Sequence, residues 1–493
     1  IHSNNMIIHG DNLEALKSFL PQYEGKIKCI YIDPPYNTGN EGWIYNDNVN
    51  DPKIKKWLGE VVGKEGEDLS RHDKWLCMMY PRLVLLQKLL AEDGAIFISI
   101  DDNEHANLLL VCNEIFGSNN FIQDIIWNKR VSPARDAKFF STDHEYILVY
   151  SKNKESLTTH FLPRTEKNNS YYKNPDNDPR GPWNSAAYTC NKSRDERPNL
   201  YYPITNPYTG EKIFPKESAV WAYSEETYQQ HVRDNLLYWG VNGEAKQPRK
   251  KAFLSEVGDV VPRSVWSHSD VGSTQKATME NNTIFNMRAF SYPKVSTLVE
   301  RIIQIASDKD SIVLDSFAGS GTTAHAVLNM NKSDGGNRKF ILVEMGDYAD
   351  TITAERVKRV INGYGEEKNA VEGTGGNFSY YELGNPLFMQ DGTINNEVDI
   401  TEVRKYVWYT ETNGIEYKED IQEKYFLGSY NDIAYYFYYE KDRVTILDYE
   451  FLTSVHKKEQ AYVMYADSCA LSDSDLQKWN ITFKKIPRDI EHI

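Results

Sequence analysis

Three short apolar runs, each followed by an acidic residue, stand out in the hydrophobic pattern of this chain. Apolar runs bounded by turn residues are typical of strands buried on both faces. The runs and their acidic residues are Ile30–Ile32 with Asp33, Ser311–Leu314 with Asp315, and Lys339–Val343 with Glu344. The second run is followed by a glycine-rich turn and then a predicted helix that Thr322 or Thr323 can cap. Alternating strands and helices predict an α/β fold with a doubly wound, mostly parallel sheet.

This alternation is interrupted once, which divides the chain into three expected domains. Residues 1–155 and 286–368 carry the alternation and should form one sheet whose switch point is a ligand site. Residues 156–285 lose it and are rich in Tyr, Trp, Asn, Pro and Arg, so we expect an inserted domain there. Residues 369–493 should form an α+β C-terminal domain, in which the aromatic stretch Tyr435–Tyr439 predicts a strand.

The first run ends in the tetrapeptide Asp33-Pro34-Pro35-Tyr36. The two prolines stiffen the turn and cannot donate backbone hydrogen bonds, so the carbonyl of Pro34 is free to face a ligand. Asp33 offers a second acceptor, and Tyr36 offers a flat ring face. This set suits an exocyclic amine of a nucleobase, because two acceptors can hold its N–H groups and point its lone pair at an electrophile. The alternative interpretation is a plain Pro-rich turn.

The turn after the second run carries the pattern Phe317-x-Gly319-x-Gly321. Its glycines let the backbone approach a ligand closely, and the helix N-terminus that follows favours an anionic group such as a carboxylate. Glu344 ends the next strand, where an acidic residue suits a ribose diol. It lies 29 residues after Asp315, whereas a dinucleotide fingerprint places it roughly 20 residues on. The spacing therefore argues against NAD and favours S-adenosylmethionine, a nucleoside with an amino-acid tail.

With these motifs in this order, the chain resembles the permuted, β-class amino-methyltransferases of DNA. Within them it is most similar to the modification (Mod) subunits of Type III restriction-modification systems, over nearly its whole length. The segments that carry the resemblance are His9–Leu16, Asp33–Asn40, Trp75–Leu90, Gly94–Glu104, His144–Lys152, Ser291–Lys294 and Val403–Thr412. Val295 is a departure, because the family often has Pro or Ser after this lysine.

The resemblance implies a Rossmann-like methyltransferase that transfers a methyl group from S-adenosylmethionine to adenine N6 at specific DNA sites. The adenine would be flipped out of the duplex, stack on Tyr36 and donate its N6 hydrogens to Asp33 and the Pro34 carbonyl. The implied catalytic residues are Asp33, Pro34, Pro35 and Tyr36. The implied cofactor-binding residues are Asp11, Lys294, Asp315, Ser316, Phe317, Gly319, Gly321, Thr322 and Glu344. No metal is expected, because the leaving group is a neutral thioether.

Two other functions remain open at the level of sequence. One is amino-methyl transfer to cytosine N4 or to RNA, which needs the same chemistry, although an aspartate at the head of the motif favours adenine within the family. The other is a DNA-recognition subunit that has lost catalysis and only positions a partner. The intact pair of motifs argues against that second alternative.

The net charge of −15 is unusual for a DNA-binding protein, because phosphate contacts need Lys and Arg. The charge is uneven: residues 160–265 hold 15 Lys and Arg against 13 Asp and Glu, whereas residues 381–450 hold 6 against 15. The inserted segment is therefore the better candidate for target recognition, although for any single residue an ordinary surface role is favoured and its aromatics suit a small core. The candidate DNA contacts are Arg180, Lys192, Arg194, Arg197, Arg249, Lys250 and Lys251.

The composition limits where the protein can work and which partners it can have. The five cysteines are scattered without a C-x-x-C pair, which indicates reduced thiols and a cytoplasmic protein. No apolar run reaches membrane length, so we expect no membrane partner. The chain begins at Ile1 rather than Met, and we expect an N-terminal piece to be missing. The resemblance adds double-stranded DNA, a second copy of the chain, and a restriction subunit with ATPase and nuclease activity as partners.

Overall fold

The computed structural model describes residues 4–38, 64–135, 137–389, 392–412, 415, 417–418 and 423–490, with side chains from residue 71 onward in the second range. Gly39 and Asn40, at the end of the Asp33–Asn40 segment, lie outside the described residues. The chain divides into two compact units, Ile1–His160 with Arg263–Ile493, and Phe161–Pro262.

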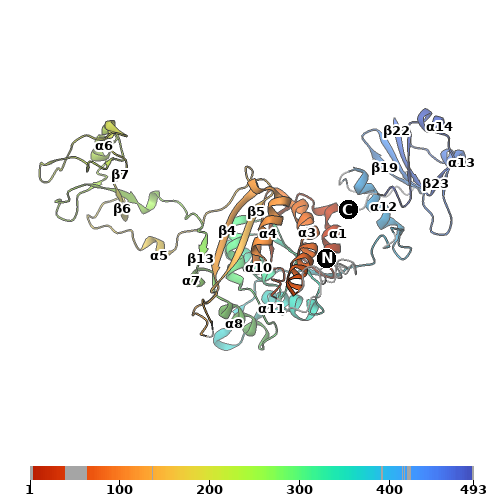
Figure 1. Ribbon diagram of the computed structural model, residues 1–493, viewed down its shortest axis with the longest axis horizontal. Helices are drawn as coiled ribbons and strands as arrows, with labels where there is room; N and C mark the ends of the chain where they lie inside the picture. Colours follow the sequence, from red (N-terminus) through yellow and green to blue (C-terminus); the bar gives the residue numbers. More distant parts are fainter. Residues whose placement is uncertain are drawn as a thin grey trace. The chain divides into compact units, whose positions relative to one another are not determined.

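A nine-stranded sheet forms the centre of the larger unit (Figure 1). Among the strands that the described residues form in this sheet, only β5 runs antiparallel to its neighbours, β3 and β4. In spatial order the strands are β13 (Val265–Trp266), β4 (Phe121–Asn128), β5 (His144–Ser151), β3 (Leu90–Ile100), β2 (Ile27–Ile32), β14 (Ile312–Asp315), β15 (Lys339–Glu344), β1 (Met6–His9) and β18 (Ser379–Glu382). The chain order is permuted about the centre, where β2 and β14, far apart in sequence, are parallel neighbours. Both strands end at the same edge.

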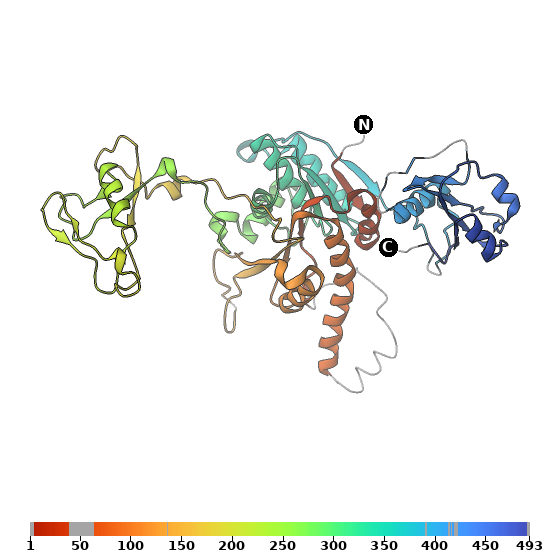
Figure 2. The same ribbon diagram turned by 90° about the horizontal axis from the view of Figure 1, so that it is seen from above.

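Helices cover the two faces of this sheet (Figures 1 and 2). On one face α3 contacts α1 and α4, and on the other α10 contacts α9 and α11, which in turn contacts α8. The helices are α1 (Asn12–Tyr23), α3 (Lys64–Leu89), α4 (His105–Cys112), α7 (His268–Val271), α8 (Thr274–Phe285), α9 (Ser296–Ala306), α10 (Thr322–Asp334) and α11 (Glu355–Asn362). The predicted α/β class with a doubly wound, mostly parallel sheet is confirmed.

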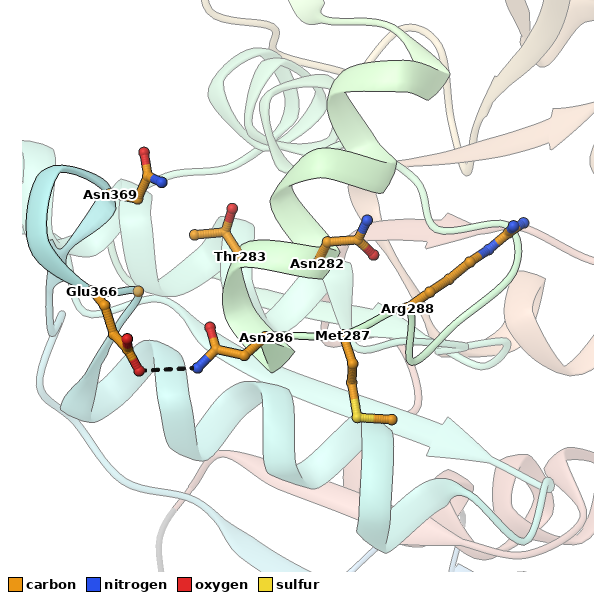
Figure 3. Close-up of a pocket in the computed structure, with 8 residues that line it drawn as sticks. Asn282, Thr283, Asn286, Met287, Arg288, Glu366 and Asn369 are labelled. Atoms are coloured by element: carbon orange, nitrogen blue, oxygen red, sulfur yellow. Dashed lines mark hydrogen bonds between the residues drawn. The ribbon is translucent and has the colours of Figure 1, made fainter.

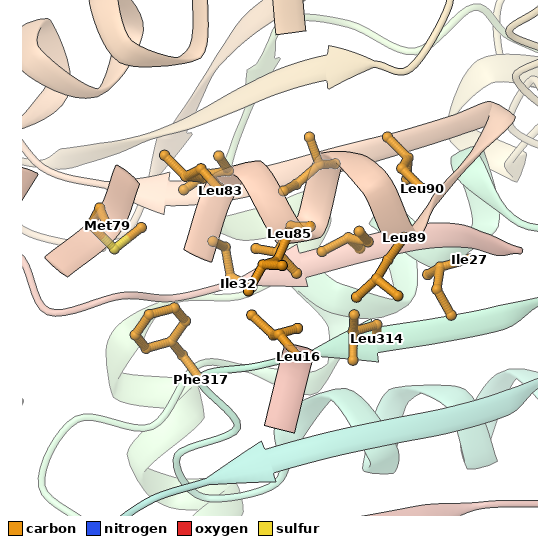
Figure 4. Close-up of a cluster of buried hydrophobic side chains, with 14 of the residues drawn as sticks. Leu16, Ile27, Ile32, Met79, Leu83, Leu85, Leu89, Leu90, Leu314 and Phe317 are labelled. Carbon is orange, nitrogen blue, oxygen red and sulfur yellow. The ribbon is translucent and has the colours of Figure 1, made fainter. Parts of the chain in front are cut away.

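Burial on both faces explains why the central strands are almost wholly apolar. All six residues of β2 are buried. Ile32 lies in one cluster with Leu83 and Leu89 of α3 and with Leu314 of β14 (Figure 4). Burying an aliphatic side chain of this size contributes about 1.5–3 kcal/mol. The apolar core therefore fixes where β2 and β14 end, and it thereby fixes the positions of Asp33 and Asp315, which end or follow these strands.

The smaller unit, Phe161–Pro262, has its own aromatic core. Tyr188, Tyr202, Trp221, Tyr228 and Trp239 are buried together, as expected for the aromatics of this segment. Its elements are α5 (Glu166–Asn169), β6 (Trp183–Ala187), β7 (Thr189–Cys190), β8 (Ile204–Thr205), β9 (Lys212–Ile213), β10 (Val220–Trp221), α6 (Glu225–Arg233), β11 (Leu237–Tyr238) and β12 (Arg249–Phe253).

The compact units differ from the three expected domains. The inserted unit begins at Phe161 rather than at 156, and residues 369–493 belong to the same compact unit as the large sheet. The compact inserted unit ends at Pro262, whereas the sequence predicted 285, because β13 joins the large sheet beside β4 and α8 packs on α11. The large sheet also continues beyond residue 368, because β18 pairs in parallel with β1 at its edge. β13 and β18 are short strands that have no long apolar run of their own.

The C-terminal part contains a second sheet, in the order β19-β20-β22-β24, with helices packed beside it. Tyr435–Phe437 lie in β20 and are buried, so the predicted strand is confirmed. The elements are α12 (Ile400–Thr412), β19 (Phe426–Tyr430), β20 (Ile433–Phe437), β21 (Ile446–Leu447), α13 (Tyr449–Thr453), β22 (Ala461–Ala466), β23 (Ser468–Cys469), α14 (Asp473–Lys478) and β24 (Ile481–Lys485); a short pair, β16 (Gly363–Tyr364) and β17 (Val371–Glu372), precedes them. Among the helices in the described ranges, none has the length and apolar character needed to cross a membrane.

Candidate active site

Asp33 directly follows β2, and its carboxylate is held by two side chains from different parts of the chain. Lys294, two residues before α9, donates from Nζ to Oδ1 at 2.6 Å and to Oδ2 at 2.7 Å. The hydroxyl of Tyr36 donates to Oδ1 at 2.8 Å. The same ammonium lies 4.9 Å from the centroid of the Tyr36 ring. The structure therefore joins the first motif to Lys294, the last residue of the Ser291–Lys294 segment, across 261 residues of sequence.

A buried glutamate extends this group. Glu145, the second residue of β5, lies with Oε2 at 3.1 Å from the Tyr36 hydroxyl and at 3.5 Å from Lys294 Nζ. Its other oxygen accepts from Lys129 Nζ at 3.0 Å. Sequence reasoning selected neither Glu145 nor Lys129. The available signal was an acidic residue placed at the start of an otherwise apolar strand.

The charges of this cluster influence one another. Burial raises the pKa of Asp33, and Glu145 adds to this, while Lys294 opposes it without cancelling the increase. Burial also raises the pKa of Glu145, but Lys294 and Lys129 outweigh it and leave this pKa below its ordinary value. Burial lowers the pKa of Lys294, but Asp33 and Glu145 outweigh it, so the ammonium stays charged. The two carboxylates are thus balanced by two lysines.

The Pro34-Pro35 turn is anchored to a helix through its backbone. The carbonyl of Pro35 accepts from the indole Nε1 of Trp75 at 2.7 Å, which anchors the turn to α3. Within the described part of the chain, no donor is hydrogen-bonded to the carbonyl of Pro34. Asn37 follows in the left-handed region, with φ of 59°, and its amide donates to the buried carboxylate of Glu104.

The glycine-rich turn wraps closely around the ends of β14 and β15. Asp315 Oδ1 accepts from the backbone N–H of Phe317 at 3.0 Å and Oδ2 from the Thr323 hydroxyl at 2.5 Å. Glu344 Oε2 accepts from the backbone N–H of Gly319 at 2.7 Å. At Gly321, with φ of 81°, an added Cβ would lie 2.9 Å from a backbone oxygen. Glycine is therefore required at this position by both conformation and space.

The two motifs border one cavity of about 690 Å³, a size typical of small-molecule sites. Of the predicted residues, Asp33, Pro34, Pro35, Lys294, Asp315, Phe317, Gly319, Thr322 and Glu344 line it. Tyr36, Asp11, Ser316 and Gly321 are not among its lining residues. Lining residues that sequence reasoning did not select include Tyr31, Phe290, Tyr292 and Tyr348. An aromatic-rich wall around three acidic residues, Asp33, Asp315 and Glu344, suits a planar, positively charged ligand.

Two carboxylates of the cavity are left without a cation among the described residues. Burial is the main cause that raises the pKa of Asp315 to about 7, and burial likewise raises the pKa of Glu344. A bound ligand with positive charge would stabilise their ionised forms. S-adenosylmethionine carries an ammonium and a sulfonium, so these residues fit it. Within the described residues, no cluster of His, Cys, Asp and Glu is placed to hold a metal.

Asp11 has a structural position outside the cavity lining. It is the N-cap of α1, where Oδ1 accepts from the backbone N–H of Leu13 at 2.7 Å. Its other oxygen lies 3.5 Å from the guanidinium of buried Arg82. Its predicted cofactor contact stays a prediction.

The candidate DNA contacts lie in the smaller unit in different environments. Lys251 is 2% exposed, and its ammonium is paired with Asp176 and Asp178 at 2.5 and 2.9 Å, so it supports the core and cannot reach a phosphate. Arg180 is paired with Asp178 at 2.7 Å, but its side chain remains partly exposed. The others lie on the surface or partly exposed: Lys192, Arg194, Arg197, Arg249 and Lys250. Lys251 is therefore withdrawn as a DNA contact.

Another hollow, elsewhere in the larger unit, is polar and open (Figure 3). Asn282 and Thr283 of α8 border it, and Asn286, directly after α8, points toward Glu366 and donates to it from Nδ2 at 3.4 Å. None of the predicted site residues borders this hollow. It offers no buried charge, and so it does not compete with the cavity between the two motifs as a catalytic site.

Comparison with known proteins agrees with this geometry. The model of the N6/N4 DNA methylase family matches residues 27–355, which include both motifs and all the cavity-lining residues. The chain belongs to this family. The predicted resemblance to amino-methyltransferases of DNA is confirmed.

Three curated relatives illustrate the similarity. The chain is 35% identical to the StyLTI Mod subunit of a Type III restriction-modification enzyme from Salmonella typhimurium, over 73% of this chain and 57% of that protein. It is 34% identical to the EcoPI Mod subunit of Escherichia phage P1, over 70% of this chain and 58% of that protein. It is 33% identical to the Type II methyltransferase M.KpnI of Klebsiella pneumoniae, over 69% of this chain and 81% of that protein. The chain thus spans somewhat under three fifths of the length of the two Mod subunits.

Proposed function

We propose that this protein is a site-specific DNA methyltransferase that transfers a methyl group from S-adenosylmethionine to adenine N6. The observation that carries the proposal is the cavity that Asp33 and the Pro34 carbonyl share with Asp315 and Glu344. It brings an amine-binding pair of acceptors next to two buried carboxylates that lack a cation. Family membership and the Mod-subunit relatives support the same reaction.

The cofactor would be held at the glycine-rich turn. Asp315 lies where it can pair with the amino group of the methionine part, and Glu344 where it can accept hydrogen bonds from the ribose. The N–H groups at the start of α10 favour the carboxylate. When bound, S-adenosylmethionine supplies an electrophilic methyl group whose leaving group is a neutral thioether. The protein therefore has to position the amine and needs no group to neutralise a leaving anion.

The base-binding half would hold a flipped adenine. Asp33 and the Pro34 carbonyl would accept the two N6 hydrogens, which orients the nitrogen lone pair toward the methyl group. Lys294 and Glu145 hold the Asp33 carboxylate and the Tyr36 ring in place through the contacts described above. N6 has to lose one proton on methylation. The carboxylate of Asp33, whose pKa is raised by burial, can accept it.

We also propose the biological setting. The Mod-subunit relatives favour the modification subunit of a Type III restriction-modification system, acting on double-stranded DNA in the cytoplasm. A restriction subunit and a second copy of the chain are the partners that follow from this assignment. The inserted unit, Phe161–Pro262, would recognise the target sequence, with Arg249 and Lys250 as candidate contacts. Phosphate contacts would position the unit, and base contacts would provide specificity.

The test is methyl transfer from labelled S-adenosylmethionine to unmethylated genomic DNA, with the product mapped by long-read sequencing. N6-methyladenine at one short, asymmetric motif is expected. Asp33→Ala should be inactive, and Asp73→Ala, which changes an exposed carboxylate of α3, is the matched control. Cytosine N4 methylation, or transfer to RNA alone, would reject the adenine assignment. Cofactor binding without any transfer, even with the restriction subunit added, would reject the enzyme in favour of a recognition subunit.

A further inference from the structure

The connection between β4 and β5, described at residues 129–135 and 137–143, exposes two adjacent aromatic side chains. Phe139 and Phe140 are 82% and 92% exposed. Large apolar side chains so fully exposed and next to each other are uncommon on a protein surface and mark an interaction site. Figure 2 shows this connection as a narrow loop that stands out from the body.

The loop rises from the edge of the sheet that carries the candidate active site. β4 runs parallel to β3 and β2, because β5 pairs antiparallel with both β3 and β4. β4 therefore ends, at Asn128, at the same edge of the sheet where Asp33 follows β2. Direct contacts link the two: Lys129, the first residue of the loop, pairs with Glu145, which contacts the hydroxyl of Tyr36.

The base of the loop is fixed, and its tip is presented to solvent. The backbone N–H of Lys129 donates to the carbonyl of Asp143 at 2.8 Å. Nearer the tip, the N–H of Ala134 donates to the hydroxyl of Ser141 at 2.7 Å. These bonds close the loop on itself. A closed loop can carry two rings outward in a defined direction, whereas a free strand end could not.

The charge around the rings identifies the kind of partner. Arg130, Arg135 and Lys138 are exposed in the same loop, and Lys138 Nζ lies 5.3 Å from the centroid of the Phe139 ring. In a protein that binds nucleic acid, aromatic rings stack on the bases and neighbouring cations contact the phosphates. An apolar protein partner would not require the cations, and the three cations beside the rings contrast with the net charge of −15 of the whole chain.

We propose that Phe139 and Phe140 form a wedge that enters the DNA duplex beside the target base and supports its flipped state. The inference rests on the proposed methyltransferase function. Apolar side chains inserted between base steps compensate for lost stacking, and a base must leave the stack before its amine can react. The three cations would hold the phosphates on either side of the opened step.

The test compares two duplexes that contain the methylation site mapped for the wild-type protein. In one the target adenine faces thymine, and in the other it faces an abasic site, which lowers the cost of flipping. The double variant Phe139→Ala with Phe140→Ala should lose at least tenfold in kcat/KM on the first duplex and recover most of it on the second. Phe139→Leu with Phe140→Leu, which keeps apolar bulk, should stay within about threefold of wild type.

A second readout and a control separate the possible outcomes. With 2-aminopurine at the target position, the alanine variant should show a smaller fluorescence increase on binding. Leu110→Ala with Val444→Ala removes two other exposed apolar side chains (67% and 71% exposed) and should change neither measurement. Equal losses on both duplexes, no loss on either, or a changed oligomeric mass would each overturn the wedge. Absence of any methylation by the wild type would instead reject the proposed function.

Discussion

The carboxylate of Asp315 should make the cofactor-free protein less stable as pH rises. Its pKa in an unfolded chain is 3.8, and burial raises it to about 7 in the folded protein. Between these values the folded chain binds one more proton than the unfolded chain. The free energy of unfolding therefore falls with increasing pH across this window, by up to about 1.4 kcal/mol per pH unit. The whole difference corresponds to about 4 kcal/mol above pH 7, as an upper limit.

Asp315→Asn should remove this cost while preserving the local contacts. The amide oxygen can still accept from the backbone N–H of Phe317, and the amide nitrogen can donate to the hydroxyl of Thr323. At pH 8 the variant should be more stable than wild type, and at pH 4 the two should be equal. The same variant should bind S-adenosylmethionine at least tenfold more weakly, because the predicted partner of the cofactor's ammonium loses its charge.

Hydrogen exchange of the β14 amides, corrected for the intrinsic rate at each pH, measures the stability of the central sheet. Asp334→Asn is the control of opposite sign, because hydrogen bonds from Arg338 lower the pKa of Asp334. Removing the charge of Asp334 should reduce the free energy of unfolding at pH 8, where the carboxylate is ionised and paired with Arg338. Equal pH dependence in wild type and Asp315→Asn, or a variant less stable than wild type at pH 8, would refute the reasoning.

Further predictions concern the base-binding residues and the inserted unit. Tyr36→Ala should lower the single-turnover methylation rate by at least a hundredfold. The DNA affinity of the variant, measured by fluorescence anisotropy, should stay unchanged. Full methylation activity in the variant would exclude base stacking on this ring. Glu145→Gln should move the acidic limb of the kcat–pH profile to lower pH, because the charge of Glu145 raises the pKa of Asp33. Glu145→Asp keeps the charge and should restore the profile. An unshifted acidic limb in the Gln variant would contradict this coupling. Lys251→Ala should destabilise the inserted unit by about 3 kcal/mol in urea unfolding, because the buried carboxylate of Asp178 loses one of its two cations and keeps only Arg180. Arg249→Ala should leave stability unchanged and reduce the salt slope of DNA binding by about 1. The opposite pattern would mean that Arg249 supports the fold and Lys251 contacts DNA.

Local patterns were sufficient to predict the elements that carry the two motifs. A buried strand needs a continuous apolar run, and a turn that approaches a ligand needs proline or glycine at set positions. For this reason Ile30–Ile32 with Asp33, and Ser311–Leu314 with Asp315, could be recognised as strand ends at a ligand site. The same reasoning predicted a strand at Tyr435–Tyr439, of which Tyr435–Phe437 lie in β20 and the last two residues follow its end. It was less successful at 263–285 and 379–382, where short elements join the large sheet without a long apolar run of their own.

The contacts between distant segments were decided only by the tertiary structure. Glu145 and Lys129 become part of the site because β5 runs antiparallel beside β3 and brings its first residues to the edge where β2 ends. Lys251 looks like a surface cation in sequence, yet the pairing of β12 with β6 buries it against Asp178. Strand and turn propensities act over a few residues, so the sequence by itself determined the two motifs. Burial and the pairing of charges depend on which strands become neighbours, and that is a property of the whole fold.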